Sequence, residues 1–293
     1  MQRRDFHRLV LLSCGTLAQG LAYAADAAPA LDKPGLWQAI ESASQGRLGV
    51  AVLDTHTGRL TGHRLDERFP MCSTFKWLAA AHVLQRVDQG LERLDRRMPF
   101  GRDVLLPWSP VTEKHADGTG MTMGALCHAA ITTSDNAAAN LILRTLGGPE
   151  GLTRFVRQLH DPVTRLDRWE PELNEATPDD ARDTSSPRAM VGLLRRCVLG
   201  DALSADGRGQ LAQWLQDTQT NRKRLGAGLP ARWRVGSKTG TGAHGTTNDV
   251  GIYWPQGRAP IVAAVFLTES QASLETREAA IARVARAVIG GLV

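Results

Sequence analysis

Strand-like segments stand at both ends of the chain and helix-like segments fill the middle, and this order constrains the fold more than any other feature. Residues 47–54 and 59–64 have the pattern of two strands and predict a hairpin. Three more strand patterns follow near the C-terminus, at residues 233–239, 248–254 and 261–267. Because strands must pair, both ends of the chain are expected to build one sheet, with the helices inserted between them.

The region from residue 66 to residue 216 carries apolar residues at helical spacing for most of its length. Two flanking helices are predicted at residues 31–44 and 276–289. We therefore expect an α/β fold with an antiparallel sheet flanked by helices, built from residues 28–65 and 217–293. An all-helical lobe would cover residues 66–216, and the functional cleft would lie between the two parts. The predicted helices of that lobe span residues 71–88, 121–131, 137–145, 151–159, 186–198 and 205–216.

The first residues have the order of an export signal. Arg3 and Arg4 form a twin-arginine pattern, an apolar run covers residues 9–21, and residues 22–24 are a site of the A-x-A cleavage type. The alternative is a buried N-terminal helix. Glycines interrupt the apolar run, which is too short to cross a membrane. Residues 1–27 therefore predict a twin-arginine-type signal, a periplasmic protein and no stable membrane association.

Charge and composition argue against a nucleic-acid partner. The 293 residues carry a net charge of +5, but the basic residues are scattered and aromatic residues make up only 5% of the chain. A nucleic-acid-binding surface usually needs clustered basic residues with aromatic residues among them, so we expect none here. The positive balance instead favours an anionic substrate or an acidic polymer of the cell surface.

The cysteines give no metal-binding pattern. Cys14 leaves with the predicted signal, and Cys72, Cys127 and Cys197 remain without a C-x-x-C pair among them. An odd number of cysteines in an exported protein leaves at least one free thiol. We expect Cys72 to be buried and inert, and we expect no metal and no cofactor.

The segment Ser73-Thr74-Phe75-Lys76 places a hydroxyl and an amine one helical turn apart. A serine hydroxyl is a weak nucleophile at neutral pH and needs an adjacent base, which Lys76 can supply. The alternative is a helix-capping serine beside a solvated lysine. The flanking residues are apolar on both sides, so we expect Lys76 on a buried helix, where an unpaired lysine is costly. This context favours Ser73 as a nucleophile.

The segment Ser134-Asp135-Asn136 lies in a polar break between two predicted helices. Serine, aspartate and asparagine are all favoured as helix caps, so the segment can cap the second helix. In a functional interpretation, Ser134 passes a proton to a leaving nitrogen and the Asn136 amide binds a substrate carbonyl. The two interpretations are compatible with each other.

The segment Lys238-Thr239-Gly240-Thr241 ends a predicted strand. Gly240 permits a ligand to approach the backbone closely, while the lysine supplies positive charge and the threonines supply hydroxyls. The alternative is an edge strand that carries a solvated lysine. In isolation the segment is compatible with both interpretations.

Residues 161–183 have no helical period and many charges, and a loop this long in a compact domain is usually functional. Asn174 follows Glu170 by four positions, so the carboxylate and the amide can hold one water molecule together. The peptide bond after Glu170 precedes a proline and is a candidate for the cis form. Arg168 and Asp183 can pair and pin the neck of the loop. The alternative is a surface charge cluster, and the loop alone does not separate the two interpretations.

In this order, the four segments resemble the motifs of class A serine β-lactamases, which are related to the penicillin-binding proteins. The resemblance extends to residues 109–115, 131–136 and 163–174, and it covers residues 31–293. It implies a two-lobed serine β-lactamase-like fold in a monomeric periplasmic enzyme. It also implies hydrolysis of the β-lactam amide of penicillins and cephalosporins, and hence antibiotic resistance, with a small-molecule β-lactam as the partner.

The resemblance further implies a role for each matched residue. Ser73 would be acylated, Ser134 would protonate the leaving nitrogen, and Lys76 and Glu170 are the two candidates for the acylation base. Glu170 would then deacylate the enzyme with a water positioned by Asn174. The residues implied to contact the substrate are Trp108, Asn136, Arg224, Lys238, Thr239, Gly240 and Thr241.

The chain departs from the family pattern at the arginine for the substrate carboxylate and at two disulfides, one of which fails because Ala80 stands at the partner position of Cys127. Thr247 stands where many members have an arginine for the substrate carboxylate. Arg224 and Arg277 match two alternative positions for that guanidinium, and we expect Arg224 to serve. Some members pair Cys72 with a second cysteine, but Gly242 stands at the partner position, so no such bridge is expected.

Two other functions share the nucleophile motifs. A D,D-peptidase or other penicillin-binding protein forms the same acyl-enzyme but lacks an efficient deacylating base. A penicillin sensor stays acylated to signal, and it needs a membrane tether. The combination of Glu170 and Asn174 argues against the peptidase, and we expect no membrane tether after the predicted signal, which argues against the sensor.

Overall fold

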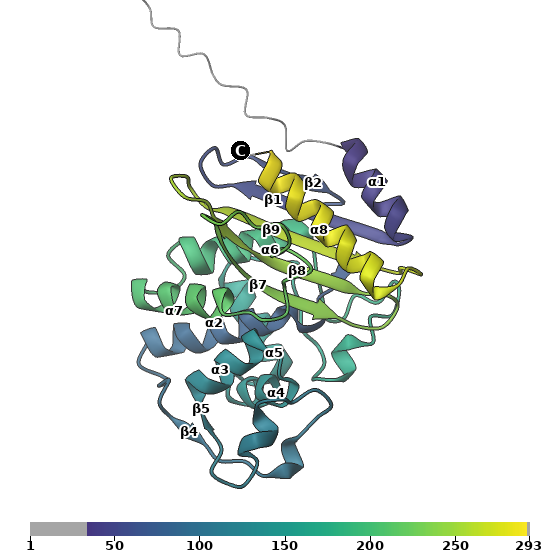
Figure 1. The fold of residues 1–293 in the computed structure, drawn as a ribbon. Helices are drawn as coiled ribbons and strands as arrows, with labels where there is room; N and C mark the ends of the chain where they lie inside the picture. Colours follow the sequence, from purple (N-terminus) through teal and green to yellow (C-terminus); the bar gives the residue numbers. More distant parts are fainter. Residues whose placement is uncertain (1–33, 292–293) are drawn as a thin grey trace, which may run out of the picture.

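The computed structural model describes residues 34–291, so the predicted signal at residues 1–27 lies outside the described residues. One antiparallel sheet joins the two ends of the chain, because its first strand pairs directly with its last (Figure 1). The strands are β1 (Arg47–Asp54), β2 (Leu60–His63), β7 (Arg234–Thr241), β8 (Thr247–Trp254) and β9 (Ile261–Thr268). Their order in the sheet is β2-β1-β9-β8-β7, which places β7 at an edge.

Helices cover both faces of this sheet. Helices α1 (Pro34–Ser44) and α8 (Leu274–Gly290) pack against each other on one face (Figure 1). The other face carries the helical part of the chain, in which α6 and α7 contact the strands directly. The helices on that side are α2 (Phe75–Asp88), α3 (Met123–Thr132), α4 (Asn136–Thr145), α5 (Gly148–Gln158), α6 (Pro187–Leu194) and α7 (Ala205–Gln216).

The side-chain alternation of the strands explains why both faces are covered. On β9, Ile261 and Val265 belong to the apolar cluster beneath α1 and α8, whereas Val262 and Phe266 belong to the cluster of the helical part. Successive side chains of a strand point to opposite faces of a sheet. A strand that is apolar at successive positions, as β9 is from Ile261 to Leu267, must therefore be buried on both faces.

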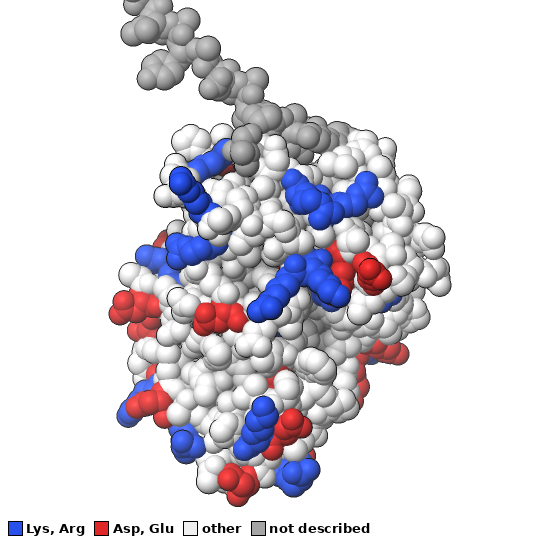
Figure 2. Space-filling view, viewed as in Figure 1, with Lys and Arg blue, Asp and Glu red and all other residues white. Residues whose placement is uncertain are grey.

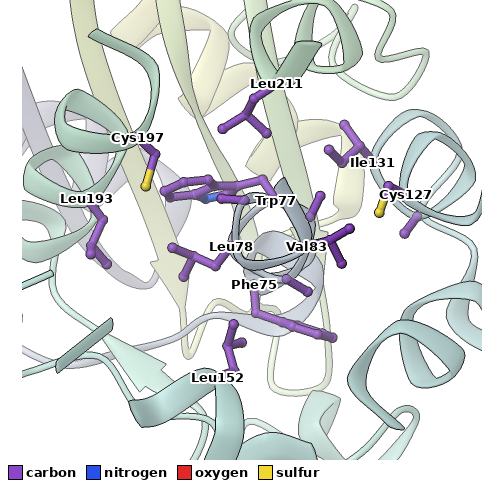
Figure 3. Packing of buried hydrophobic residues seen from close by; sticks show 14 of the residues in the cluster. Phe75, Trp77, Leu78, Val83, Cys127, Ile131, Leu152, Leu193, Cys197 and Leu211 are labelled. Atoms are coloured by element: carbon purple, nitrogen blue, oxygen red, sulfur yellow. The ribbon is translucent and has the colours of Figure 1, made fainter. Parts of the chain in front are cut away.

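Helix α2 is the centre of the helical part. Its residues Phe75, Trp77 and Val83 are fully buried, and side chains from α3, α5, α6 and α7 surround them (Figure 3). Burying one large apolar side chain stabilises a fold by about 1.5–3 kcal/mol. Every residue from Phe75 to Ala81 is buried, so the first half of the helix is held in one position, and this fixes the turn that carries Ser73 and Lys76.

Several boundaries differ from the predicted ones. The helix predicted over residues 71–88 begins as a 3₁₀ turn at Cys72–Thr74, a tighter geometry that is common at helix ends. The helix predicted over residues 186–198 is shorter and continues as a π-helical turn at Arg195–Leu199. The sequence pattern missed two short ladders in the otherwise helical part, because two-residue pairings have no periodic signature. They join β3 (Phe69–Pro70) to β6 (Thr184–Ser185) and β4 (Arg97–Met98) to β5 (Met121–Thr122).

Candidate active site

Ser73, Lys76 and Glu170 meet at the start of α2. The Ser73 hydroxyl donates to Glu170 Oε1 at 3.1 Å, and Lys76 Nζ lies 2.9 Å from the same oxygen. All three side chains are buried, as expected for Lys76 from its apolar neighbours. One carboxylate oxygen therefore contacts both the hydroxyl and the amine, which places a base directly beside a candidate nucleophile.

The Lys76 amine has a full set of hydrogen-bond acceptors. Besides Glu170, its Nζ donates to the backbone oxygen of Ser134 at 2.9 Å and to Asn136 Oδ1 at 2.6 Å. An ammonium group has three N–H donors, and these acceptors match them. Burial lowers the pKa of Lys76, while the Glu170 carboxylate acts in the opposite direction. The amine therefore gives up a proton more readily than a solvated lysine does.

The segment at residues 134–136 both caps a helix and lines the site. Asp135 is the N-cap of α4, and its Oδ2 accepts from the backbone N–H groups of Val111 and Thr112, both at 2.9 Å. Ser134 has a φ of 62°, which few residues other than glycine adopt. This backbone turn directs Asp135 away from the site while Ser134 and Asn136 face Lys76.

Lys238 approaches the same group from β7. Its Nζ donates to Ser134 Oγ at 3.1 Å and to the backbone oxygen of Thr239 at 2.7 Å. The side chain is fully buried, so the alternative of a solvated lysine on an edge strand is wrong. Burial lowers the pKa of Lys238, and the charge of Lys76 adds to this effect. Within residues 34–291 no carboxylate forms an ion pair with Lys238, so its amine is free to pair with an anionic ligand, whose charge would raise that pKa again.

Gly240 and Arg224 shape the edge of β7 that faces the nucleophile. A Cβ at Gly240 would lie 2.7 Å from the Met71 oxygen, so only glycine lets the strand pack this closely against the turn before α2. Arg224 is buried and donates to the Gly240 oxygen and to Thr241 Oγ1, both at 3.0 Å. Arg277, the other candidate guanidinium, makes no hydrogen bond to β7 in the described part of the chain.

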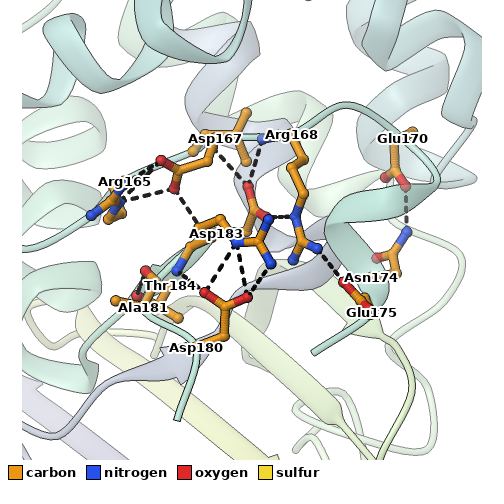
Figure 4. A network of polar contacts seen from close by, with 12 residues as sticks. Arg165, Asp167, Arg168, Glu170, Asn174, Glu175, Asp180, Ala181, Asp183 and Thr184 are labelled. Atoms are coloured by element: carbon orange, nitrogen blue, oxygen red, sulfur yellow. Dashed lines mark hydrogen bonds and ion pairs between the residues drawn. The ribbon is translucent and has the colours of Figure 1, made fainter. Parts of the chain in front are cut away.

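The loop at residues 161–183 is closed at its neck by a buried ion pair. Arg168 Nε donates to Asp183 Oδ2 at 2.6 Å, which confirms the predicted pairing (Figure 4). The other oxygen of Asp183 accepts from the backbone N–H groups of Asp167 and Arg168, at 2.7 and 2.9 Å. The peptide bond between Glu170 and Pro171 is cis, as expected.

Two asparagines hold Glu170 in place. Asn174 Nδ2 donates to Glu170 Oε2 (Figure 4). Asn140, on α4, donates to the Glu170 backbone oxygen at 2.8 Å and accepts from its backbone N–H at 3.0 Å. The alternative of an exposed charge cluster is therefore wrong for Glu170, which is 2% exposed. Asn140 is a site residue that was not predicted from the sequence, where its only signal is its place four residues after Asn136, on the same face of the helix.

Trp108 stands at the rim of this group. Its indole is 66% exposed, and its Nε1 donates to the Thr133 oxygen at 2.9 Å. Its backbone oxygen accepts from the Asn136 N–H at 3.0 Å. These contacts tie an exposed aromatic ring to the turn that carries Ser134, in agreement with a place at the mouth of the site.

Neither a disulfide nor a metal-binding cluster of side chains occurs among the described residues. Cys72, Cys127 and Cys197 are free and buried. Burial raises the pKa of the Cys72 thiol, which keeps it inert although it directly precedes Ser73. The described residues contain no group of three or more His, Cys, Asp or Glu side chains that could hold a metal ion.

Comparisons with known proteins identify the family. The model of the β-lactamase enzyme family matches residues 36–292. The solved structure of an ancestral class A β-lactamase is similar with a TM-score of 0.87 and 61% sequence identity, over 89% of this chain and 99% of that chain. The chain belongs to the class A β-lactamase family. The two-lobed fold of this family is the one that the sequence resemblance implied.

Two relatives match this class A β-lactamase along nearly its whole length. The carbapenem-hydrolysing β-lactamase KPC of Klebsiella oxytoca is 48% identical over 290 residues, which are 98% of this chain and 97% of that protein. The β-lactamase CTX-M-25 of Escherichia coli is 42% identical over 291 residues, which are 99% of this chain and all of that protein. These matches include the helical part and the sheet, and hence every element that contributes to the site.

Proposed function

We propose that this class A β-lactamase hydrolyses the cyclic amide of penicillins and cephalosporins through an ester on Ser73, and so confers antibiotic resistance. The observation that carries the proposal is the position of Glu170. Its Oε1 lies 3.1 Å from Ser73 Oγ and 2.9 Å from Lys76 Nζ, and its other oxygen is bound to Asn174. A single carboxylate is thus equipped both to assist a nucleophilic serine and to activate a water molecule.

The first half of the reaction forms the acyl-enzyme. Ser73 Oγ attacks the lactam carbonyl carbon, and the carbon–nitrogen bond of the ring breaks. The hydroxyl proton moves to Glu170 or to Lys76, and both remain candidates for the base. Ser134 donates its proton to the leaving nitrogen and regains one from the group that accepted the Ser73 proton, so that Glu170 is ionised again before deacylation. Lys76 Nζ lies 3.4 Å from Ser134 Oγ, which permits this return. Lys238 lies 3.1 Å from Ser134 Oγ, and its positive charge favours loss of the Ser134 proton.

The negative charge that develops on the carbonyl oxygen needs donors in fixed positions. We assign this role to the backbone N–H groups of Ser73 and Thr241. The close packing at Gly240 supports the assignment, because it brings the end of β7 against the turn that carries Ser73. One such donor typically contributes about 2.7–4 kcal/mol to transition-state stabilisation.

Buried positive charge supports an anionic substrate. Lys238 is fully buried without an ion pair among the described residues, and Arg224 lies beside it at the end of β7. We assign the substrate carboxylate to these two cations and to the hydroxyls of Thr239 and Thr241. Basic side chains also gather on the sheet half of the molecule, over α8 and the adjoining strands, and attract anions from a distance (Figure 2).

The second half of the reaction releases the product. A water molecule held between Glu170 and Asn174 loses a proton to the carboxylate and attacks the ester carbonyl. The bond to Ser73 Oγ then breaks, and the serine regains its proton. A penicillin-binding protein lacks this deacylating step, so the pair of Glu170 and Asn174 distinguishes the hydrolase from that alternative.

Turnover of nitrocefin, a chromogenic cephalosporin, tests the proposal. We expect sustained hydrolysis that a chelator does not reduce, together with full loss in Ser73→Ala. A single burst with one equivalent of product per enzyme would instead indicate a penicillin-binding protein or a penicillin sensor. Loss of turnover in the presence of the chelator would contradict the mechanism on Ser73.

We further propose that residues 1–27 export the enzyme to the periplasm, where it acts as a monomer. The twin arginines Arg3 and Arg4 before an apolar run support export. Within residues 34–291, no helix combines the length and the apolar character required to cross a membrane. Cell fractionation of Arg3→Lys/Arg4→Lys should show activity retained inside the inner membrane. Undiminished periplasmic activity would contradict the export proposal, and gel filtration tests the monomer.

A further inference from the structure

A buried carboxylate on β8 lies behind the anion-binding cations and has no part in the reaction above. Asp249 is fully buried opposite Thr239 in the ladder between β7 and β8. Its Oδ2 accepts from the Leu225 N–H at 3.0 Å, and its Oδ1 has no hydrogen-bond partner among the described residues. Burial raises the pKa of Asp249 to about 6. Burying a carboxylate with one unpaired oxygen destabilises the fold, so the presence of Asp249 indicates a role other than stability.

Strand β8 holds the segment of Arg224 and Leu225 at three points. The Asn248 oxygen accepts from the Arg224 guanidinium at 2.9 Å, and Asp249 accepts from the Leu225 N–H. The Tyr253 hydroxyl donates to the Leu225 oxygen at 2.8 Å. Both polar groups of the Leu225 backbone are thus held by buried side chains of one strand, and this fixes the direction in which the preceding residue points.

Arg224 needs such support because it belongs to the irregular segment between α7 and β7. Its guanidinium reaches the end of β7, where it contacts Thr241 Oγ1 at 3.0 Å, and its Nε lies 3.2 Å from Glu278 on α8. An arginine that is free to rotate loses conformational entropy when it binds a ligand. Holding it in the binding position beforehand lowers that cost.

We propose that Asp249 is a positioning residue for the anion site: it holds the Leu225 N–H and thereby fixes Arg224 against Thr241, ready for the substrate carboxylate. This inference rests on the proposed function, because it requires Arg224 to bind that carboxylate. A residue with a purely structural role would affect all substrates alike. Asp249 instead affects substrates that carry a carboxylate and spares those that lack one.

Steady-state kinetics with a penicillin and with its methyl ester test this proposal. We expect Asp249→Ala to raise KM for the penicillin about tenfold with little change in kcat, because a buried donor loses its acceptor. The KM for the ester should stay nearly the same. Asp249→Asn keeps an acceptor for the Leu225 N–H and should retain most of the affinity. The double variant Arg224→Ala/Asp249→Ala should behave like Arg224→Ala alone, because both changes remove one interaction.

Three results would overturn the proposal. They are an unchanged KM for the penicillin in Asp249→Ala, an equal loss with the ester, and additive losses in the double variant. If Asp249→Ala does not fold, Tyr253→Phe releases the other side of the Leu225 backbone and is expected to give the same selective rise in KM. The wild type separates this proposal from the proposed function. If the wild type does not hydrolyse penicillin, the proposed function is refuted. If it does, and the variants have an unchanged KM, only the role of Asp249 is refuted.

Discussion

The hydroxyl of Ser73 and the carboxylate of Glu170 are in direct contact, with 3.1 Å between Oγ and Oε1, although the two residues are 97 positions apart in the sequence. Ser73 stands at the buried start of α2, whereas Glu170 belongs to the loop at residues 161–183. The site is therefore complete only while that loop is docked. The ion pair between Arg168 and Asp183 closes its neck. Contacts that dock it include the hydrogen bonds between Asn140 and the Glu170 backbone and the hydrogen bond from the Ala243 N–H to the Asn174 oxygen.

Replacing Lys76 by alanine tests the acylation half of the mechanism. The change removes the amine that lies 2.9 Å from Glu170 and leaves that carboxylate buried without a cation. We expect the acylation rate with a penicillin to fall by ~10²–10⁴-fold, the usual contribution of a positioned acid–base group. Pre-steady-state formation of the acyl-enzyme measures this rate. Lys114→Ala, at an exposed position, is the control, and equal acylation in the two variants would refute a role for Lys76.

Replacing Asn140 by alanine tests how Glu170 is held. Both side-chain hydrogen bonds of Asn140 within residues 34–291 go to the Glu170 backbone, at 2.8 and 3.0 Å, so its loss lets the carboxylate shift without altering its chemistry. A misplacement of about 1 Å can reduce a rate by roughly 10²-fold. We expect deacylation to slow more than acylation, so that the acyl-enzyme accumulates during turnover. The exposed Arg144→Ala on the same helix is the control, and an Asn140→Ala enzyme that shows no accumulation would count against this account.

Replacing Asp183 by alanine tests the neck of the loop. The change leaves Arg168 without its buried partner and removes the acceptor of two backbone N–H groups. Breaking a buried ion pair typically costs about 3–5 kcal/mol, and we expect a loss of this size in the free energy of unfolding. Urea denaturation measures it. Arg182→Ala, which removes an exposed pair with Asp180, should cause no measurable change, and similar stability of the two variants would show that the neck pair is unimportant.

Replacing Asp249 by asparagine should change how stability depends on pH. Burial raises the pKa of Asp249 from 3.8 to about 6, so its contribution to stability is full below pH 3.8 and is lost as the pH rises to about 6. Asparagine does not titrate. From pH 4 to pH 7, the unfolding free energy of the variant minus that of the wild type should therefore increase, by up to about 3 kcal/mol. Urea denaturation at both pH values measures this difference.

The matched control for that comparison is Asp103→Asn, at an exposed position. The difference in unfolding free energy between this control and the wild type should be the same at the two pH values. A constant difference between Asp249→Asn and the wild type would mean that the Asp249 carboxylate is not destabilised by burial. The same variant connects stability with function, because asparagine still accepts from the Leu225 N–H and should preserve the anion site.

The sequence predicted those features that local patterns encode. Strand periodicity at both ends gave the sheet, and the apolar flanks of Lys76 gave its burial. The features that it missed depend on contacts between distant residues. Nothing near Asn140 or Asp249 indicates that the first holds a loop 30 positions away or that the second holds the Leu225 backbone. Similarly, three residues suited to capping stood at 134–136, and only the structure shows that Asp135 is the N-cap.

The intact mass of Glu170→Ala after mixing with a penicillin tests the central claim most directly. If the loop carboxylate activates the water that cleaves the ester, the variant should gain the full mass of the penicillin on Ser73 and keep it long after the wild type has returned to its free mass. A variant that returns to its free mass as fast as the wild type would contradict the account.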